Sequence, residues 1–138
     1  MSRKATICLA IAVLAQAGCG GGGALSEQGL QKQAEAVQSL AAEGALVAQG
    51  AQEDRTTDTF VRVHTEYLAK AAAKVESALD SAHATGRLDA RRARAERLAL
   101  LVSNDLDRLH RHPGDRALAA RVKSALERHA VTAEALAK

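Results

Sequence analysis

Apolar residues recur every three or four positions along three stretches of this sequence, and this spacing restricts the fold more than any other feature. The three series are Val61, His64, Leu68, Ala71, Val75, Ala78 and Ala82; Ala95, Ala99, Val102, Leu106 and Leu109; and Leu118, Val122, Ala125, His129, Thr132 and Leu136. Such spacing places each series on one face of an α-helix. Alanine, the strongest helix former, supplies 32 of the 138 residues. The sequence therefore predicts an all-α protein.

Local signals place a further helix before these three. Ser26 is a candidate N-cap for a helix over residues 26–51. Gly29, Gly44 and Gly50 lie inside this stretch, and each interior glycine costs about 1 kcal/mol relative to alanine. We therefore expect this helix to be weak and to form mainly by packing on the others.

The remaining helices are bounded by capping and turn residues. One helix is expected over residues 58–85, with Thr57 or Asp58 as its cap and Gly86 after it in the left-handed conformation. A second is expected from Asp89, its cap, to about residue 111, because Pro113 should end it. A third is expected over residues 115–137. Short turns fold neighbouring helices back on each other, so residues 26–138 are expected to form a small antiparallel up-down bundle of three to four helices.

The core of this bundle is expected to be thin. Phe60 and Tyr67 are the only aromatic residues, and alanine fills many of the apolar positions. Alanine lets helices approach closely but buries little area, and apolar burial contributes about 25 cal/mol per Å². We therefore expect a protein partner or a second copy of the chain to add stability.

The N-terminal residues have the organisation of an export signal. Residues 2–4 give a basic start, residues 5–17 form an apolar run, and small residues follow. Ala17-Gly18-Cys19 resembles the lipobox of bacterial lipoproteins, in which the cysteine is diacylated and becomes the new N-terminus. The resemblance implies a signal peptide over residues 1–18, lipidation of Cys19, and a glycine-rich tether over residues 19–25.

A second cleavage site competes with this interpretation. Ala15-Gln16-Ala17 also fits an ordinary signal peptidase, which would cut after Ala17 and release a secreted protein with one free thiol. Lipidation accounts for that otherwise unpaired cysteine, and two or more acyl chains give stable membrane attachment.

The resemblance also implies a location and a partner, namely the cell envelope and a membrane reached through the lipid anchor. In a Gram-negative cell, Gly20 after the cysteine implies the periplasmic side of the outer membrane. Residues 19–138 contain 17 basic and 16 acidic residues, a formal net charge of +1. A charge this small gives no indication of nucleic-acid binding.

His64 and His129 are the candidate ligands for a metal. Both occupy apolar series, and two histidines facing a bundle core can bind a metal ion. The alternative is that they lie at the core boundary, since the sequence lacks Glu-x-x-His and the other spacings typical of metal sites. We expect no cofactor, and no motif indicates a catalytic residue.

Five arginines lie close together at positions 87, 91, 92, 94 and 97, followed by Arg108 and Arg111. They can contact anionic lipid headgroups, or they can form a solvated helix face neutralised by Asp89, Glu96, Asp105 and Asp107. Together these features predict a lipid-anchored envelope protein with a structural or protein-interaction role and no catalysis. The alternative function is a periplasmic ligand- or metal-binding bundle that uses His64 and His129.

Overall fold

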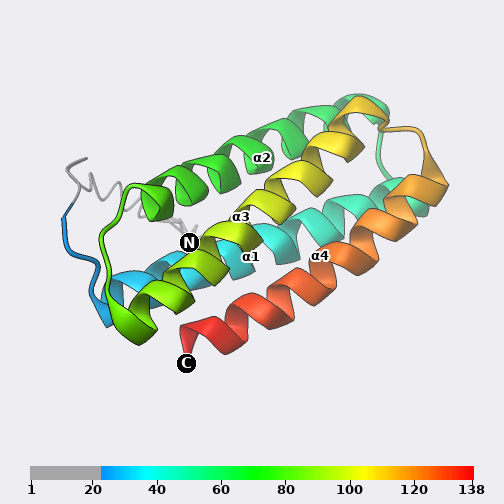
Figure 1. Ribbon diagram of the computed structural model, residues 1–138. Helices are drawn as coiled ribbons and strands as arrows, with labels where there is room; N and C mark the ends of the chain where they lie inside the picture. The colour runs from blue at the N-terminus through cyan, green and yellow to red at the C-terminus, as the bar shows by residue number, and fades with distance from the viewer. Residues whose placement is uncertain (1–22) are drawn as a thin grey trace, which may run out of the picture.

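Four α-helices account for most of residues 23–138, the part of the chain that the computed structural model describes (Figure 1). The helices are α1 (Glu27–Gln52), α2 (Asp58–Asp80), α3 (Gly86–Arg111) and α4 (Arg116–Ala137). Successive helices run in opposite directions, and residues 23–138 contain no strand beyond an isolated bridge between Ala24 and His83. The predicted all-α up-down bundle is confirmed, with four helices.

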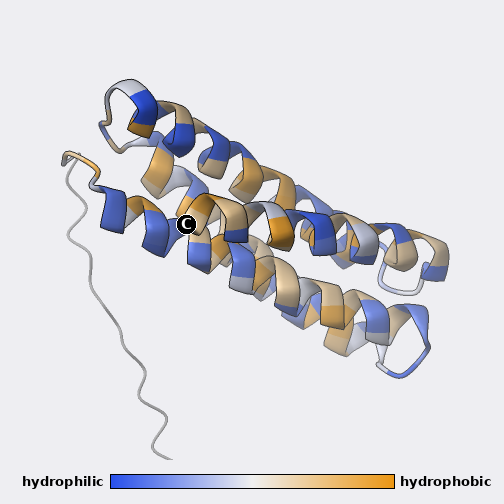
Figure 2. Cartoon of the chain, turned by 90° about the horizontal axis from the view of Figure 1, so that it is seen from below, coloured by the Kyte–Doolittle hydropathy of each residue, from blue (hydrophilic) through white to orange (hydrophobic). Residues whose placement is uncertain are grey.

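The helices pack as two close pairs. α1 packs most extensively on α4, and α2 on α3, while smaller contacts join α1 to α2 and α3 to α4. Across the diagonals, α1 reaches α3, but α2 and α4 do not contact each other. Hydrophobic and hydrophilic positions alternate along each helix (Figure 2). α1 and α3 therefore each contact all three of the other helices, whereas α2 and α4 each contact two.

The first helix forms over its full expected length and packs on the others, as predicted. α1 is continuous over 26 residues, and the Ser26 hydroxyl caps it by accepting a hydrogen bond from the Gly29 amide at 3.0 Å. At Gly44, a Cβ atom would lie 2.7 Å from Leu106 Cδ2 and 3.0 Å from Leu126 Cδ1. This glycine therefore lets leucines of α3 and α4 approach the α1 backbone, and close packing offsets its low helix propensity.

The predicted apolar series differ in how well they match the core. All five members of the series on α3 are buried. On α2, Ala78 is exposed while Thr65, Ala72 and Leu79 are buried, and on α4, Thr132 is exposed while Ala133 is buried. A helix that packs between two neighbours buries a stripe wider than one row, so adjacent positions enter the core.

The connection between α2 and α3 also differs from expectation. α2 ends at Asp80 rather than near residue 85, and α3 begins at Gly86 rather than after Asp89. Gly86 has the expected positive φ of 60°, but it is the first residue of α3. Thr85 precedes α3 without a side-chain capping bond, and Asp89 instead lies in the first turn. By contrast, Thr57 caps α2 and α3 ends at Arg111, as predicted.

The packing at Gly44 yields a stability prediction. Gly44→Val would place methyl groups against Leu106 and Leu126, and we expect the free energy of unfolding to fall by about 2 kcal/mol through overpacking. Ala42→Val is the matched control, because Ala42 is exposed on the same helix and should lose only about 0.5 kcal/mol through helix propensity. Urea denaturation measures both, and equal losses would show that Gly44 is not a tight contact.

Candidate functional site

The N-terminal segment joins the bundle at one end. The Leu25 amide donates to the His83 carbonyl at 2.8 Å, and the His83 amide donates to the Gly23 carbonyl at 3.4 Å. The Leu25 side chain packs against a small core cluster that contains Leu30 and Leu79. Residues 23–25 of the expected tether are therefore held against the connection between α2 and α3. Cys19, the predicted lipidation site, lies outside the described residues.

Arg91 fastens the same end of the bundle. Its guanidinium forms an ion pair with Glu27, at the start of α1, and donates a hydrogen bond to the Leu136 carbonyl at 2.9 Å. Leu136 lies in the last turn of α4, where backbone carbonyls lack partners within the helix and attract positive charge. One arginine thus joins the beginning of α1 to the end of α4.

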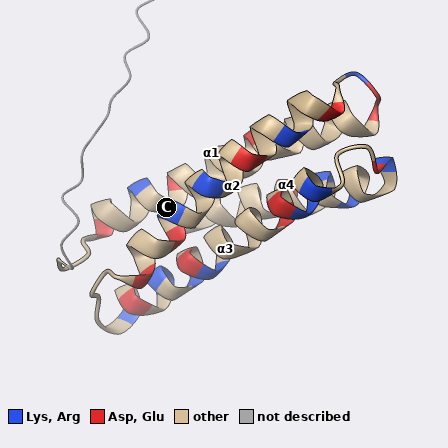
Figure 3. Cartoon of the chain, turned by 90° about the horizontal axis from the view of Figure 1, so that it is seen from above, with Lys and Arg blue, Asp and Glu red and all other residues tan. Residues whose placement is uncertain are grey.

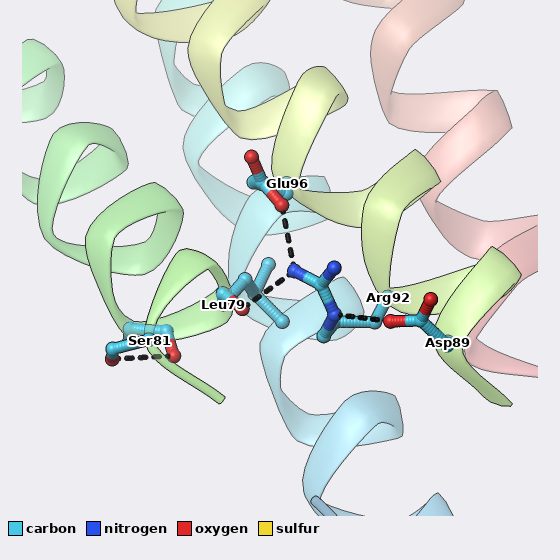
Figure 4. Close-up of polar contacts among 6 residues, drawn as sticks. Leu79, Ser81, Asp89, Arg92 and Glu96 are labelled. Atoms are coloured by element: carbon cyan, nitrogen blue, oxygen red, sulfur yellow. Dashed lines mark hydrogen bonds and ion pairs between the residues drawn. The ribbon is translucent and has the colours of Figure 1, made fainter. Parts of the chain in front are cut away.

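Arg92 holds the neighbouring corner (Figure 4). Its guanidinium donates to Asp89 at 2.8 Å, to Glu96 at 2.7 Å, and to the Leu79 carbonyl at 2.9 Å. Only 16% of its side chain is exposed. The hydrogen bond to Asp89 raises the pKa of Arg92 above its ordinary value. Arg92 therefore caps the last turn of α2 and fixes α2 against α3.

The predicted basic run is divided by these contacts. Arg91 and Arg92 face the bundle, whereas Arg87, Arg94 and Arg97 are exposed. The acids expected to neutralise the whole run pair with only three of its arginines. Asp89 and Glu96 pair with Arg92, Asp105 with Arg108, and Asp107 with Arg111. Within residues 23–138, no ion pair reaches Arg94 or Arg97.

Three hollows lie along α3, α4 and the turn between them, and arginines line each one. The largest, about 640 Å³, lies between α3 and α4 and is bounded by Arg94 and Arg97 together with the apolar side chains of Leu98, Leu101 and Leu136. A second hollow adjoins the first at Thr132, is lined by α4 alone, and contains Arg128 and Val131. A third lies at the turn between the helices and is lined by Arg108, Arg111 and Arg121. We call these three hollows the α3–α4 groove.

The groove belongs to the basic half of the bundle. Residues 86–138, which form α3 and α4, contain twelve Lys and Arg and seven Asp and Glu, a formal net charge of +5. Residues 23–85, which form α1 and α2, contain five and nine, a formal net charge of −4. Figure 3 shows these charges along the helices. The small net charge of residues 19–138 therefore conceals two halves of opposite sign.

The structure does not bring the two candidate metal ligands together. His64 lies on α2 and His129 on α4, which make no contact with each other. His129 Nε2 donates to Asp105 Oδ2 at 3.2 Å, whereas His64 stacks on Phe60 with ring centroids 4.0 Å apart. Residues 23–138 contain no group of three or more His, Cys, Asp or Glu side chains placed to hold a metal ion.

No family model matches this sequence, and no curated protein or solved structure is significantly similar to it. Of the helices in residues 23–138, none combines the length and apolar character that a bilayer span requires.

Sequence reasoning identified the arginines but not the groove they line. The signal was present, because Arg94 and Arg97 have no acidic residue three or four positions away on either side. The difference in charge between the two halves of the chain was a second signal. The short turn after Pro113 predicted that the last two helices lie side by side, but local pattern did not show which side chains line the hollows along them.

The contacts of Arg92 predict a large effect on stability. Arg92→Gln removes a charged donor from Asp89, Glu96 and the Leu79 carbonyl, and we expect the free energy of unfolding to fall by about 2 kcal/mol. Arg94→Gln removes the same charge from an exposed position of the same helix and should change it by less than about 0.5 kcal/mol. Urea denaturation distinguishes the two, and similar values would contradict the assigned role of Arg92.

Substitution of His64 is predicted to increase the stability of the protein, in contrast to substitution of Arg92. Its Nδ1 atom is buried without a hydrogen-bond partner among the described residues, so His64→Leu should raise the free energy of unfolding, by about 1 kcal/mol. His110→Leu is the control, because His110 Nδ1 donates to the Arg62 carbonyl at 3.0 Å and its loss should not stabilise the protein. Thermal and urea denaturation report both, and a loss of stability in His64→Leu would show that the contacts of the ring, including its stacking on Phe60, outweigh the cost of the unpaired Nδ1 atom.

Proposed function

We propose that this protein is a lipid-anchored protein of the bacterial cell envelope that acts through binding contacts rather than catalysis. The proposal begins with Ala17-Gly18-Cys19, which resembles the lipobox of bacterial lipoproteins. It places the acyl chains on Cys19 and the helical bundle beyond them. The bundle is then the part of the molecule that meets a partner.

One observation carries this proposal furthest, namely the attachment of residues 23–25 to the end of the bundle. The backbone bonds between Leu25, Gly23 and His83 fix the point at which the chain enters the folded domain. Cys19 is four residues before Gly23, and four residues of extended chain reach at most about 14 Å. A lipid on Cys19 would therefore keep this end of the bundle next to the bilayer.

A binding role is also supported by how the bundle uses its polar side chains. Arg91, Arg92 and His110 each donate to a backbone carbonyl on a neighbouring helix. These bonds hold α3 against α2 and α4, and a fixed arrangement gives a surface of defined shape.

Substitution of the two cysteines tests the anchor. We expect the full chain, expressed in a bacterium that processes lipoproteins, to fractionate with membranes. Its intact mass should show the loss of residues 1–18 and the gain of acyl chains. Cys19→Ala should lose the acyl mass and the membrane association, because no thiol remains for the thioether linkage.

Cys8→Ala is the matched control, since it removes a thiol from the apolar run of the signal but leaves Cys19 in place. It should behave as the wild-type chain does. A wild-type protein that is cut after Ala17 and carries no acyl chains would establish the secreted alternative. A protein that retains Met1 in the cytosol would end both interpretations.

A further inference from the structure

We propose that the α3–α4 groove is a docking surface for an anionic phospholipid bilayer, with its arginines on the phosphate groups and its exposed apolar side chains at the acyl boundary. The inference deepens the proposed function, on which it rests for the presence of a membrane. It gives the tethered bundle a second point of contact and a fixed side turned to the lipid.

The charge of the groove is the first argument. Its three hollows are lined by six arginines and only two acids. Both acids have other partners, because Glu127 forms an ion pair with Lys123 and Asp115 accepts a hydrogen bond from the Leu118 amide. Among the described residues, no ion pair engages four of these arginines, which are Arg94, Arg97, Arg121 and Arg128. Guanidinium groups without carboxylate partners bind phosphate oxygens strongly, in bidentate geometry.

The apolar side chains of the groove are the second argument. Leu101 is 43% exposed and Val131 is 68% exposed, and each lies in a hollow beside an arginine. Large apolar residues interspersed with arginine on a helical surface suit the boundary between headgroups and acyl chains. A nucleic acid fits this surface less well, since no Phe, Tyr or Trp side chain lines the three hollows to stack on bases.

The division of charge in the bundle is the third argument. The half formed by α3 and α4 has a formal net charge of +5, and the half formed by α1 and α2 has −4. Near an anionic surface, this separation turns the α3–α4 side toward the lipid and the other side away from it. The orientation follows from the whole bundle and not from one side chain.

The position of the groove is the fourth argument. Its largest hollow includes Leu136, whose carbonyl accepts the hydrogen bond from Arg91 at the end of the bundle where residues 23–25 attach. A bilayer within about 14 Å of Gly23 is therefore close to the beginning of the groove. The anchor and the groove can engage the same membrane at the same time.

Vesicle binding by residues 19–138, the mature chain of the proposed lipoprotein, carrying Cys19→Ser tests the proposal without an acyl chain or the signal peptide. We expect binding to vesicles of phosphatidylglycerol and phosphatidylcholine in equal parts, weakening as ionic strength rises, and much weaker binding to phosphatidylcholine alone. Each basic residue near an anionic bilayer strengthens binding about fivefold. The double variant Arg94→Gln with Arg97→Gln should therefore bind the anionic vesicles about 25-fold more weakly.

The matched control is Lys32→Gln with Lys74→Gln, which removes two exposed positive charges from α1 and α2. It should bind within about twofold of the parent, and circular dichroism should show that both double variants are folded. Arg94→Lys with Arg97→Lys should recover most of the binding if charge at these positions is what matters.

Two results would overturn the proposal. The first is equal binding of anionic vesicles by the parent and by Arg94→Gln with Arg97→Gln. The second is a parent protein that does not bind anionic vesicles but self-associates, with Leu101→Ser abolishing the self-association. That result would assign the groove to a second copy of the chain. Because Cys19→Ser carries no acyl chains, either result leaves the proposed lipidation untouched, and failure of lipidation in cells would leave vesicle binding unaffected.

Discussion

The close approach of α1 to α3 and α4 at Gly44 is the contact on which the rest of the bundle depends. With hydrogen in place of a side chain, the α1 backbone lies against Leu106 and Leu126. Leu106 and Leu126 are both fully buried at this junction, which compensates for the small volume of the alanines around them. The close approach at Gly44 also brings α3 and α4 to the same segment of α1, where they lie beside each other. The contacts of α1 with α3 and α4 add to the direct contact between those two helices, along which the α3–α4 groove lies.

Local pattern was sufficient to predict the class of fold and most helix boundaries. The caps at Ser26 and Thr57, and the end of α3 before Pro113, follow from the chemistry of a few neighbouring residues. The end of α2 was wrong because non-local contacts decide it. Arg92 caps the Leu79 carbonyl from the next helix, and His83 is drawn into pairing with residues 23–25. Neither contact can be predicted from the sequence around residue 80.

The arginines of α3 show why composition alone could not identify the candidate site. Arg91 and Arg92 are adjacent in sequence to Arg94 and belong to the same basic run, yet they stabilise the bundle while Arg94 points into the groove. An α-helix turns by about 100° for each residue, so neighbouring positions face different surroundings. The acids near the run were expected to neutralise it as a whole. They pair with the arginines that share their face and leave Arg94 and Arg97 without such partners.

A short tether would lower the affinity for lipid that the groove needs in order to remain bound to the membrane. The proposed acyl anchor at Cys19 would fix one point of the molecule but leave the bundle free to rotate about that point. Linking two contacts through a short segment makes the second one intramolecular, with an effective concentration in the millimolar range. A groove that binds free lipid only weakly would then be occupied most of the time. Rotation toward the bilayer would be favoured further by the opposite net charges of the α3–α4 half and the α1–α2 half, since turning the bundle over would present Glu and Asp to the same surface. Anchor and groove would thus act together, the first setting the distance from the membrane and the second setting which side of the bundle remains open to other molecules.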